Sequence, residues 1–168
     1  MEVEELALSE AVLAGFEERL VVYYSGQQRL ARDILRRVMG RWLSREPAVI
    51  GLMERLKQSA GNLRAALLKG RWARVAEEIG GYWGIKKELF PGSATPAVDV
   101  MFMELREHYA AAGLAGAGGG GFAYFFCKDA RQAARLRELL AERAGRPGSL
   151  GRVYASRINR RGLVVKTT

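Results

Sequence analysis

Cysteine and histidine are almost missing from this sequence of 168 residues, which contains one of each. Cys127 alone cannot form an intrachain disulfide, and together with His108 it falls short of the ligands that a structural zinc site needs. Nucleophilic chemistry of the Ser-His-Asp or Cys-His kind would have to use His108, which lies in a helical pattern far from any nucleophile motif. We therefore expect no bound metal ion and a structural role for both residues.

The sequence also lacks a recognisable targeting or membrane segment. The first ten residues, MEVEELALSE, are acidic and have no apolar run of the kind found in signal peptides. Residues 109–127 carry no charge, but six of these 19 residues are glycine, which argues against a transmembrane helix. The length and the 49% hydrophobic content predict one folded domain over residues 1–168, which we expect in the cytoplasm with no membrane partner.

Positive charge is in excess, since 27 lysines and arginines against 18 acidic residues give a net charge of +9. Such an excess suits a nucleic-acid partner or an anionic small ligand. The alternative is an ordinary solvated surface rich in arginine. The second interpretation is favoured because the arginines are spread over most of the expected helices, and adjacent pairs occur only at Arg36-Arg37 and Arg160-Arg161.

Apolar spacing predicts both strands and helices. Residues 19–25 favour a strand, and Ser25 with Gln28 forms a capping box that would open a helix reaching about residue 44. Further helices are expected from Pro47 to Gly70, over residues 71–89, from Thr95, and from Asp129 to about Ala144, with further strands over residues 122–127, around Val153 and over residues 163–165. In the helix after Pro47, the stripe expected to face the core is Ile50, Met53, Leu56, Ala60, Leu63 and Leu67. This order predicts an α+β fold, a small antiparallel sheet covered by helices on one side.

The segment from Gly113 to Gly121 is the most informative part of the sequence. Glycines permit positive φ angles and close backbone approach, and successive N–H groups in such a turn can bind an anion. A tight structural turn, a loop beside a phosphate group and a flexible linker are the alternatives. Both flanks are apolar, which disfavours the linker. No Gly-Lys-Ser/Thr follows as in a Walker A loop, and a strand, where a Rossmann motif has a helix, comes next.

Residues 121–125 also overlap a signature of RNA-recognition domains, and alternation would place Phe122, Tyr124 and Phe126 on one sheet face. However, Gly120 occupies the leading basic position and Cys127 the closing aromatic one. We therefore do not expect a nucleic-acid partner.

Four separated segments resemble the GHMP kinases, in their L-fucose kinase branch. The first is the glycine turn Gly116-Ala117-Gly118-Gly119-Gly120-Gly121, similar to the third conserved motif of that family. The second is Leu20-Val21-Val22-Tyr23-Tyr24-Ser25-Gly26-Gln27-Gln28-Arg29-Leu30-Ala31-Arg32, where Ser25 replaces the usual threonine and Gln27 stands where lysine is common. The third is Tyr82-Trp83-Gly84-Ile85-Lys86-Lys87, and the final segment 162–166 resembles the closing strand. The resemblance implies a ferredoxin-like GHMP kinase C-terminal domain.

The resemblance also implies a function, the transfer of the ATP γ-phosphate to the anomeric hydroxyl of L-fucose. It implies that the glycine loop supports the phosphate site, through Gly116, Ala117, Gly118, Gly119, Gly120 and Gly121. Ser25, Gly26 and Arg29 would lie on the sugar side of the cleft, with capping for Ser25 and a surface ion pair for Arg29 as the structural alternatives.

The family's ATP loop, of Pro-x-x-Gly-Leu-Gly-Ser-Ser type, lies in an N-terminal domain and is absent from these residues. We therefore expect ATP, Mg²⁺ and the catalytic base mainly on a partner domain, in cis or in trans, and no catalytic residue or activity in this chain alone. A heptose-phosphate kinase relative and a stand-alone ligand-binding or regulatory module remain alternatives. For Lys86 and Lys87 a solvated helix end is favoured over contact with phosphate, and Trp42, Trp72 and Trp83 are expected in the core.

Overall fold

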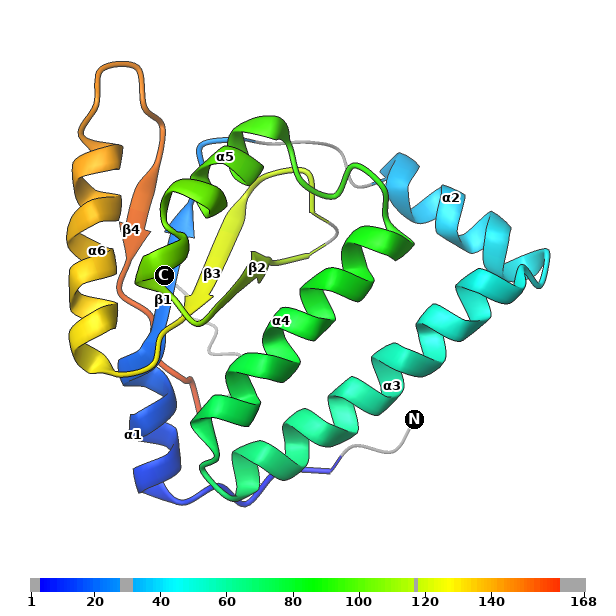
Figure 1. The fold of residues 1–168 in the computed structure, drawn as a ribbon, viewed down its shortest axis with the longest axis horizontal. Coiled ribbons are helices and arrows are strands. Elements are labelled where there is room, and N and C mark those ends of the chain that lie inside the picture. The colour runs from blue at the N-terminus through cyan, green and yellow to red at the C-terminus, as the bar shows by residue number, and fades with distance from the viewer. Residues whose placement is uncertain (1–3, 28–31, 117, 161–168) are drawn as a thin grey trace, which may run out of the picture.

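A computed structural model describes residues 4–27, 32–116 and 118–160, with the backbone alone for residues 32–34. The elements run in the order α1 (Glu10–Arg19), β1 (Leu20–Tyr24), α2 (Arg32–Leu43), α3 (Pro47–Leu68), α4 (Trp72–Leu89), α5 (Pro96–Glu104), a 3₁₀ turn (Arg106–His108), β2 (Ala111–Leu114), β3 (Phe122–Phe126), α6 (Ala130–Ala144) and β4 (Arg152–Tyr154). This confirms the expected α+β class (Figure 1). Within these ranges no helix has the length and apolar character needed to cross a membrane.

The four strands form one antiparallel sheet in the order β2-β3-β1-β4. Strand β1 lies inside the sheet, with Val22 opposite Tyr124 of β3 and Tyr23 opposite Val153 of β4. The strands at β1 and β3 were expected, whereas β2 was not, because its sequence Ala-Ala-Gly-Leu has little β propensity. All four of its residues are nevertheless buried, so tertiary packing holds this strand. The expected strand over residues 163–165 lies outside the described residues.

One face of the sheet packs against α5 and α6 and forms the main core. Val21 and Tyr23 of β1 and Phe125 of β3 point to this side, as the two-residue period of a strand requires. The Phe125 ring meets the Phe102 ring of α5 edge-on, with 5.5 Å between ring centroids. The residues of α6 that complete the core are Ala133, Leu136 and Leu140, which confirms the inward face expected for that helix.

The other face is partly covered by α1, α3 and α4, so helices lie on both sides of the sheet and not on one. Phe126 is fully buried there, with its ring centroid 5.4 Å from that of Phe16 and 6.2 Å from that of Trp72. Because Phe126 is covered, Phe122, Tyr124 and Phe126 cannot form the open aromatic row that the RNA-recognition signature would need.

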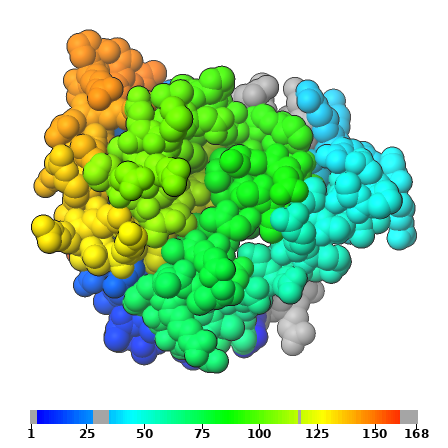
Figure 2. Space-filling model, in the orientation of Figure 1, coloured from blue at the N-terminus to red at the C-terminus, as the bar shows by residue number. Residues whose placement is uncertain are grey.

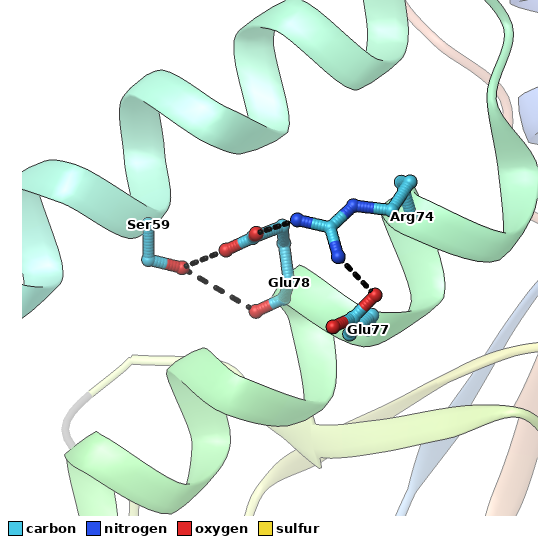
Figure 3. Close-up of polar contacts among 4 residues, drawn as sticks. All are labelled: Ser59, Arg74, Glu77 and Glu78. Carbon is cyan, nitrogen blue, oxygen red and sulfur yellow. Dashed lines mark hydrogen bonds and ion pairs between the residues drawn. The ribbon is translucent and has the colours of Figure 1, made fainter.

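Helices α3 and α4 form an antiparallel pair joined by a polar contact. The Ser59 hydroxyl donates a hydrogen bond to Glu78 Oε2 at 3.0 Å, and Glu78 also accepts one from Arg74 at 3.2 Å (Figure 3). The buried side chains of α3 are Val49, Leu52, Ser59 and Ala66. Of the expected stripe, Met53, Leu56, Leu63 and Leu67 are half-buried and pack against two hydrophobic clusters, whereas Ala60 is exposed.

Helix α2 begins later than expected. Gly26 and Gln27 are not helical, because Gly26 has φ +76°, and the first described helical residue is Arg32. Val38 packs into a small cluster with Val49 and Leu52 of α3 and with Ile85 and Leu89 of α4. Trp42 is 43% exposed, contrary to its expected place in the core. Figure 2 shows α2 and the start of α3 (cyan) at one edge of the molecule.

We expect Phe125→Ala to lower the free energy of unfolding by about 3–5 kcal/mol, because it leaves a cavity in the main core. The matched control on the same strand is Phe122→Ala, which removes a side chain that is 41% exposed and should cost less than about 1 kcal/mol. Urea unfolding followed by circular dichroism measures both. Similar losses in the two variants would contradict the assigned faces of β3.

Candidate functional site

The loop between β2 and β3 is built from left-handed glycines. The φ angles are +66° at Gly116, +89° at Gly118, +83° at Gly119, +127° at Gly120 and +76° at Gly121. Side chains with a Cβ rarely adopt these angles, so the glycine-rich composition is a requirement of the path that the chain takes here. Ala117, the remaining member of the expected motif, lies outside the described residues.

Main-chain hydrogen bonds hold this loop in place. The Gly119 N–H donates to the carbonyl oxygen of Ser93 at 2.5 Å, and the Gly121 N–H donates to that of Gln27 at 2.7 Å. In return, the Ser25 N–H donates to the Gly121 carbonyl oxygen at 2.8 Å. The loop is therefore a fixed turn seated against residues 25–27 and not a flexible linker.

The packing is too close for side chains at two positions. A Cβ atom on Gly118 would lie 2.9 Å from the Ser93 Cβ, and one on Gly120 would lie 2.8 Å from the Gln27 carbonyl oxygen. Beside Gly116 and Gly121, by contrast, a Cβ would meet nothing within 4 Å. Conformation and space thus both require glycine at Gly118 and Gly120.

Alternate amides of the loop differ in their use. The N–H groups of Gly119 and Gly121 donate to carbonyl oxygens of the chain. Those of Gly118 and Gly120 have no acceptor among the described residues. The Ser93 hydroxyl, in a residue 1% exposed, also lacks a partner there. Free N–H groups in positive-φ backbone are of the kind that can bind anions. The Gly118 and Gly120 amides are therefore candidate donors, and the phosphate role expected for this loop stays a prediction.

Ser25 and Gly26 line a pocket of about 270 Å³ beside the glycine loop. The Ser25 hydroxyl accepts a hydrogen bond from the Gln27 N–H at 3.3 Å, in a local turn, and the Gln28 of the expected capping box lies outside the described residues. Arg29, the third residue expected on the sugar side, also lies outside them. The pocket is completed by Tyr23, Gln27, Ala97, Val98, Met101, Arg143, Gly148, Ser149 and Leu150.

Arg143 and Ser149 were not expected in this pocket. Arg143 is one of several arginines on α6 and forms an ion pair with Glu104 at 2.5 Å. Ser149 lies in the loop that follows α6. No sequence motif around either residue indicates a binding role. Glycine at position 26 allows the loop after α6 to approach closely, because a Cβ on Gly26 would lie 2.7 Å from the Leu150 Cβ. Only the tertiary fold therefore identifies these two polar side chains.

The start of α5 lies at the same place. As expected, Thr95 caps this helix, and its hydroxyl accepts a hydrogen bond from the Val98 N–H at 3.3 Å. The same hydroxyl donates to the side-chain carbonyl oxygen of Gln27. Gln27 thus links α5 through its side chain and the glycine loop through its backbone.

Lys86 contradicts the expectation of a solvated helix end. It is 3% exposed, and its ammonium donates hydrogen bonds to the carbonyl oxygens of Leu114 at 2.7 Å and Gly116 at 2.5 Å. Burial lowers the pKa of this ammonium below its ordinary value. Lys87, one residue further along α4, is exposed as expected.

Neither metal binding nor thiol chemistry finds support in the described part of the chain. It contains no group of three or more histidine, cysteine, aspartate or glutamate side chains that could hold a metal ion. Cys127 is fully buried, and burial raises the pKa of its thiol to about 11. Its S–H group points to the His108 carbonyl oxygen, 3.7 Å away. At neutral pH this thiol stays protonated and out of reach, which excludes a nucleophilic role.

Comparison with known proteins gives a consistent result. The family described as GHMP kinases C terminal matches residues 63–145. The chain is 34% identical over 144 residues to the bifunctional fucokinase/GDP-fucose pyrophosphorylase of Arabidopsis thaliana, which covers 86% of this chain and 14% of that protein. It is 29% identical over 127 residues to the L-fucokinase/L-fucose-1-P guanylyltransferase of Bacteroides fragilis, covering 76% of this chain and 13% of that protein. The chain thus spans about one seventh of the length of these relatives.

A solved structure supports the same fold. The L. major mevalonate kinase in complex with R-mevalonate superposes with a TM-score of 0.65 at 18% sequence identity, over 80% of this chain and 40% of that one. The likeness at this identity concerns the fold, and it extends beyond residues 63–145 to most of the chain.

We expect Gly120→Ala to destabilise the protein by at least about 2 kcal/mol, because the new Cβ meets the Gln27 carbonyl oxygen at a φ angle that alanine avoids. The matched control is Gly116→Ala, which has open space and needs only the left-handed conformation, at about 1 kcal/mol. Urea unfolding compares the two variants. Equal losses would show that the loop is not packed as described.

Proposed function

Because the chain belongs to the GHMP kinase C-terminal family through residues 63–145, we propose that it is the C-terminal domain of a sugar kinase that phosphorylates the anomeric hydroxyl of L-fucose. The choice of sugar rests on the two relatives named as fucokinases, which align with most of this chain. The γ-phosphate of ATP would be the group transferred. The chain alone is expected to be inactive.

The observation that carries this proposal is the pairing of Gly121 with the turn at residues 25–27. Gly121 donates to the Gln27 carbonyl oxygen and accepts from the Ser25 N–H, at 2.7 and 2.8 Å. The candidate phosphate loop and the candidate sugar-side residues are therefore in direct contact. A phosphoryl transfer requires its two reactants to be held side by side, and this contact would hold both binding elements in a fixed relation.

The glycine loop would act by position and by its dipoles. Phosphoryl transfer depends mainly on positioning and on neutralising phosphate charge. The amides of Gly118 and Gly120 would face either a phosphate oxygen or the phosphate-binding loop of a second domain, supplied in cis or in trans. Side chains would keep such a loop away, whereas glycine permits close backbone approach.

The sugar would lie beside Ser25 and Gly26, with Arg29, Arg143 and Ser149 as further contacts. The pocket of about 270 Å³ is at the small end for a ligand site. We therefore infer that a second domain closes over it and supplies the rest of the sugar contacts. Hydroxyl and guanidinium groups suit a polyol substrate, because each can pair with a sugar hydroxyl.

Mg²⁺ and the catalytic base are assigned to the second domain. The described residues hold no cluster of carboxylates, the ligands that Mg²⁺ prefers beside substrate phosphates. The ion would neutralise phosphate charge during transfer. This chain's share of the reaction is to complete the cleft and to fix the geometry of the glycine loop.

A phosphorylation assay tests the proposal directly. The chain alone, and the chain joined to a GHMP kinase ATP-loop domain, are incubated with ATP, Mg²⁺ and a panel of L-fucose, D-galactose and heptose phosphates. We expect sugar 1-phosphate from L-fucose only when both domains are present. A preference for heptose phosphate would favour the other kinase branch, and no phosphorylation of any sugar would favour a binding module without catalysis.

In the active two-domain enzyme, Ser25→Ala should raise the KM for the sugar by about tenfold with a smaller change in kcat, since it removes one hydroxyl partner. Ser44→Ala is the matched control, because Ser44 is exposed in the turn between α2 and α3, away from the pocket. Initial rates over a range of sugar concentrations separate the two constants. An unchanged KM in Ser25→Ala would remove this residue from the sugar site.

A further inference from the structure

Lys86 is a buried lysine whose hydrogen bonds bracket the start of the glycine loop. Its two acceptors, the carbonyl oxygens of Leu114 and Gly116, lie on either side of Ala115, where β2 ends and the loop begins. An ammonium has three donors and no acceptor, so one group can hold two carbonyl oxygens at once. Lys86 thereby ties helix α4 to the loop across 28 and 30 residues of sequence.

Within residues 4–27, 32–116 and 118–160, no acidic side chain forms an ion pair with Lys86. Burial lowers the pKa of its ammonium below the ordinary value. Its other close neighbours are ring faces, with Nζ 5.9 Å from the centroid of Tyr82 and 5.5 Å from that of Trp83. Burying the charge carries a desolvation cost, whereas the two hydrogen bonds satisfy carbonyl oxygens that an apolar side chain would leave without this donor. Lys86 is therefore placed to hold these two carbonyl oxygens.

The other hydrogen bonds that hold the glycine loop lie closer to its C-terminal end. Gly119 and Gly121 are tied to Ser93 and Gln27, so without Lys86 the segment from Leu114 to Gly116 would have no polar attachment to a helix among the described residues. The φ angle of +66° at Gly116 sets the direction in which the next glycines leave the sheet. A group that holds the Gly116 carbonyl oxygen therefore controls the orientation of the peptide that follows.

We propose that Lys86 is a positioning residue that holds the glycine loop in the conformation required for phosphoryl transfer. This inference rests on the proposed function for its catalytic consequence, and on the contacts of the chain itself for its structural part. Lys86 acts through the carbonyl oxygens of Leu114 and Gly116 and does not touch the phosphate. The two parts are tested separately.

The structural part is tested in the 168-residue chain by amide hydrogen exchange. Lys86→Met keeps the length of the side chain and removes all donors. We expect the Gly119 and Gly121 amides to exchange at least about tenfold faster, with the amides of β1 and α6 unchanged. The control is Lys87→Met, which should leave the loop amides as they are. Unchanged exchange in folded Lys86→Met would overturn the proposal.

A second measurement keeps the test decisive if Lys86→Met fails to fold. Lys86 Nζ donates hydrogen bonds to the carbonyl oxygens of Leu114 and Gly116. In the unmodified chain, NMR scalar couplings between Nζ and the two carbonyl carbons report these hydrogen bonds directly. Their presence supports the proposal, and a freely rotating, solvent-exchanging ammonium would overturn it.

The catalytic part is tested in the two-domain enzyme. Lys86→Met should lower kcat by about tenfold or more and leave the sugar KM within about threefold, since the loop and not the sugar pocket is disturbed. Lys86→Gln, which keeps a donor, should recover part of the loss. An unchanged kcat, or a change in KM alone, would overturn the positioning role. If no sugar is phosphorylated by the unmodified enzyme, the proposed function fails, whereas the exchange result still decides the structural part.

Discussion

The close contact between the backbones of the glycine loop and of residues 25–27 is the constraint on which the site depends. The Gly121 N–H reaches the Gln27 carbonyl oxygen at 2.7 Å, and the atoms there leave no room for a Cβ on Gly120. This approach fixes where β3 begins relative to the end of β1. It also places the Thr95 cap of α5 beside Gln27. Loop, turn and helix start therefore form one unit, which a side chain at Gly118 or Gly120 would disrupt.

Much of the fold could be predicted from the sequence because its signals are local. Thr95 and Asp129 cap the helices expected from them, and the apolar run at β1 forms a strand inside the sheet. Strand β2 could not be predicted, because alanine and glycine carry little β propensity and only burial between β3 and α4 selects the extended form. The start of α2 was misplaced because Gly26 takes a positive φ angle that ends the apparent capping pattern.

The candidate site likewise contains residues that local sequence signals predict and residues that only the tertiary fold brings in. Composition and flanking residues predicted a fixed glycine turn, and the resemblance placed Ser25 and Gly26 near it. Arg143 and Ser149 reach the pocket from a helix end and a loop more than 100 residues from Ser25, a relation that no local spacing encodes. Lys86 was misread for a related reason. A lysine near a helix end usually extends into water, and only the position of β2 against α4 reveals the two carbonyl oxygens that it contacts.

Helix α2 has a practical consequence for work with the protein. Met39 is 62% exposed and Leu43 is 76% exposed, and both lie beside a hollow of about 480 Å³ between α2 and α3. Exposed apolar surface of this kind promotes self-association in concentrated solution. Replacing Met39 or Leu43 by glutamate would improve solubility without touching the glycine loop or the pocket. Such a surface variant is the natural starting material for crystallisation and for the spectroscopy of the loop.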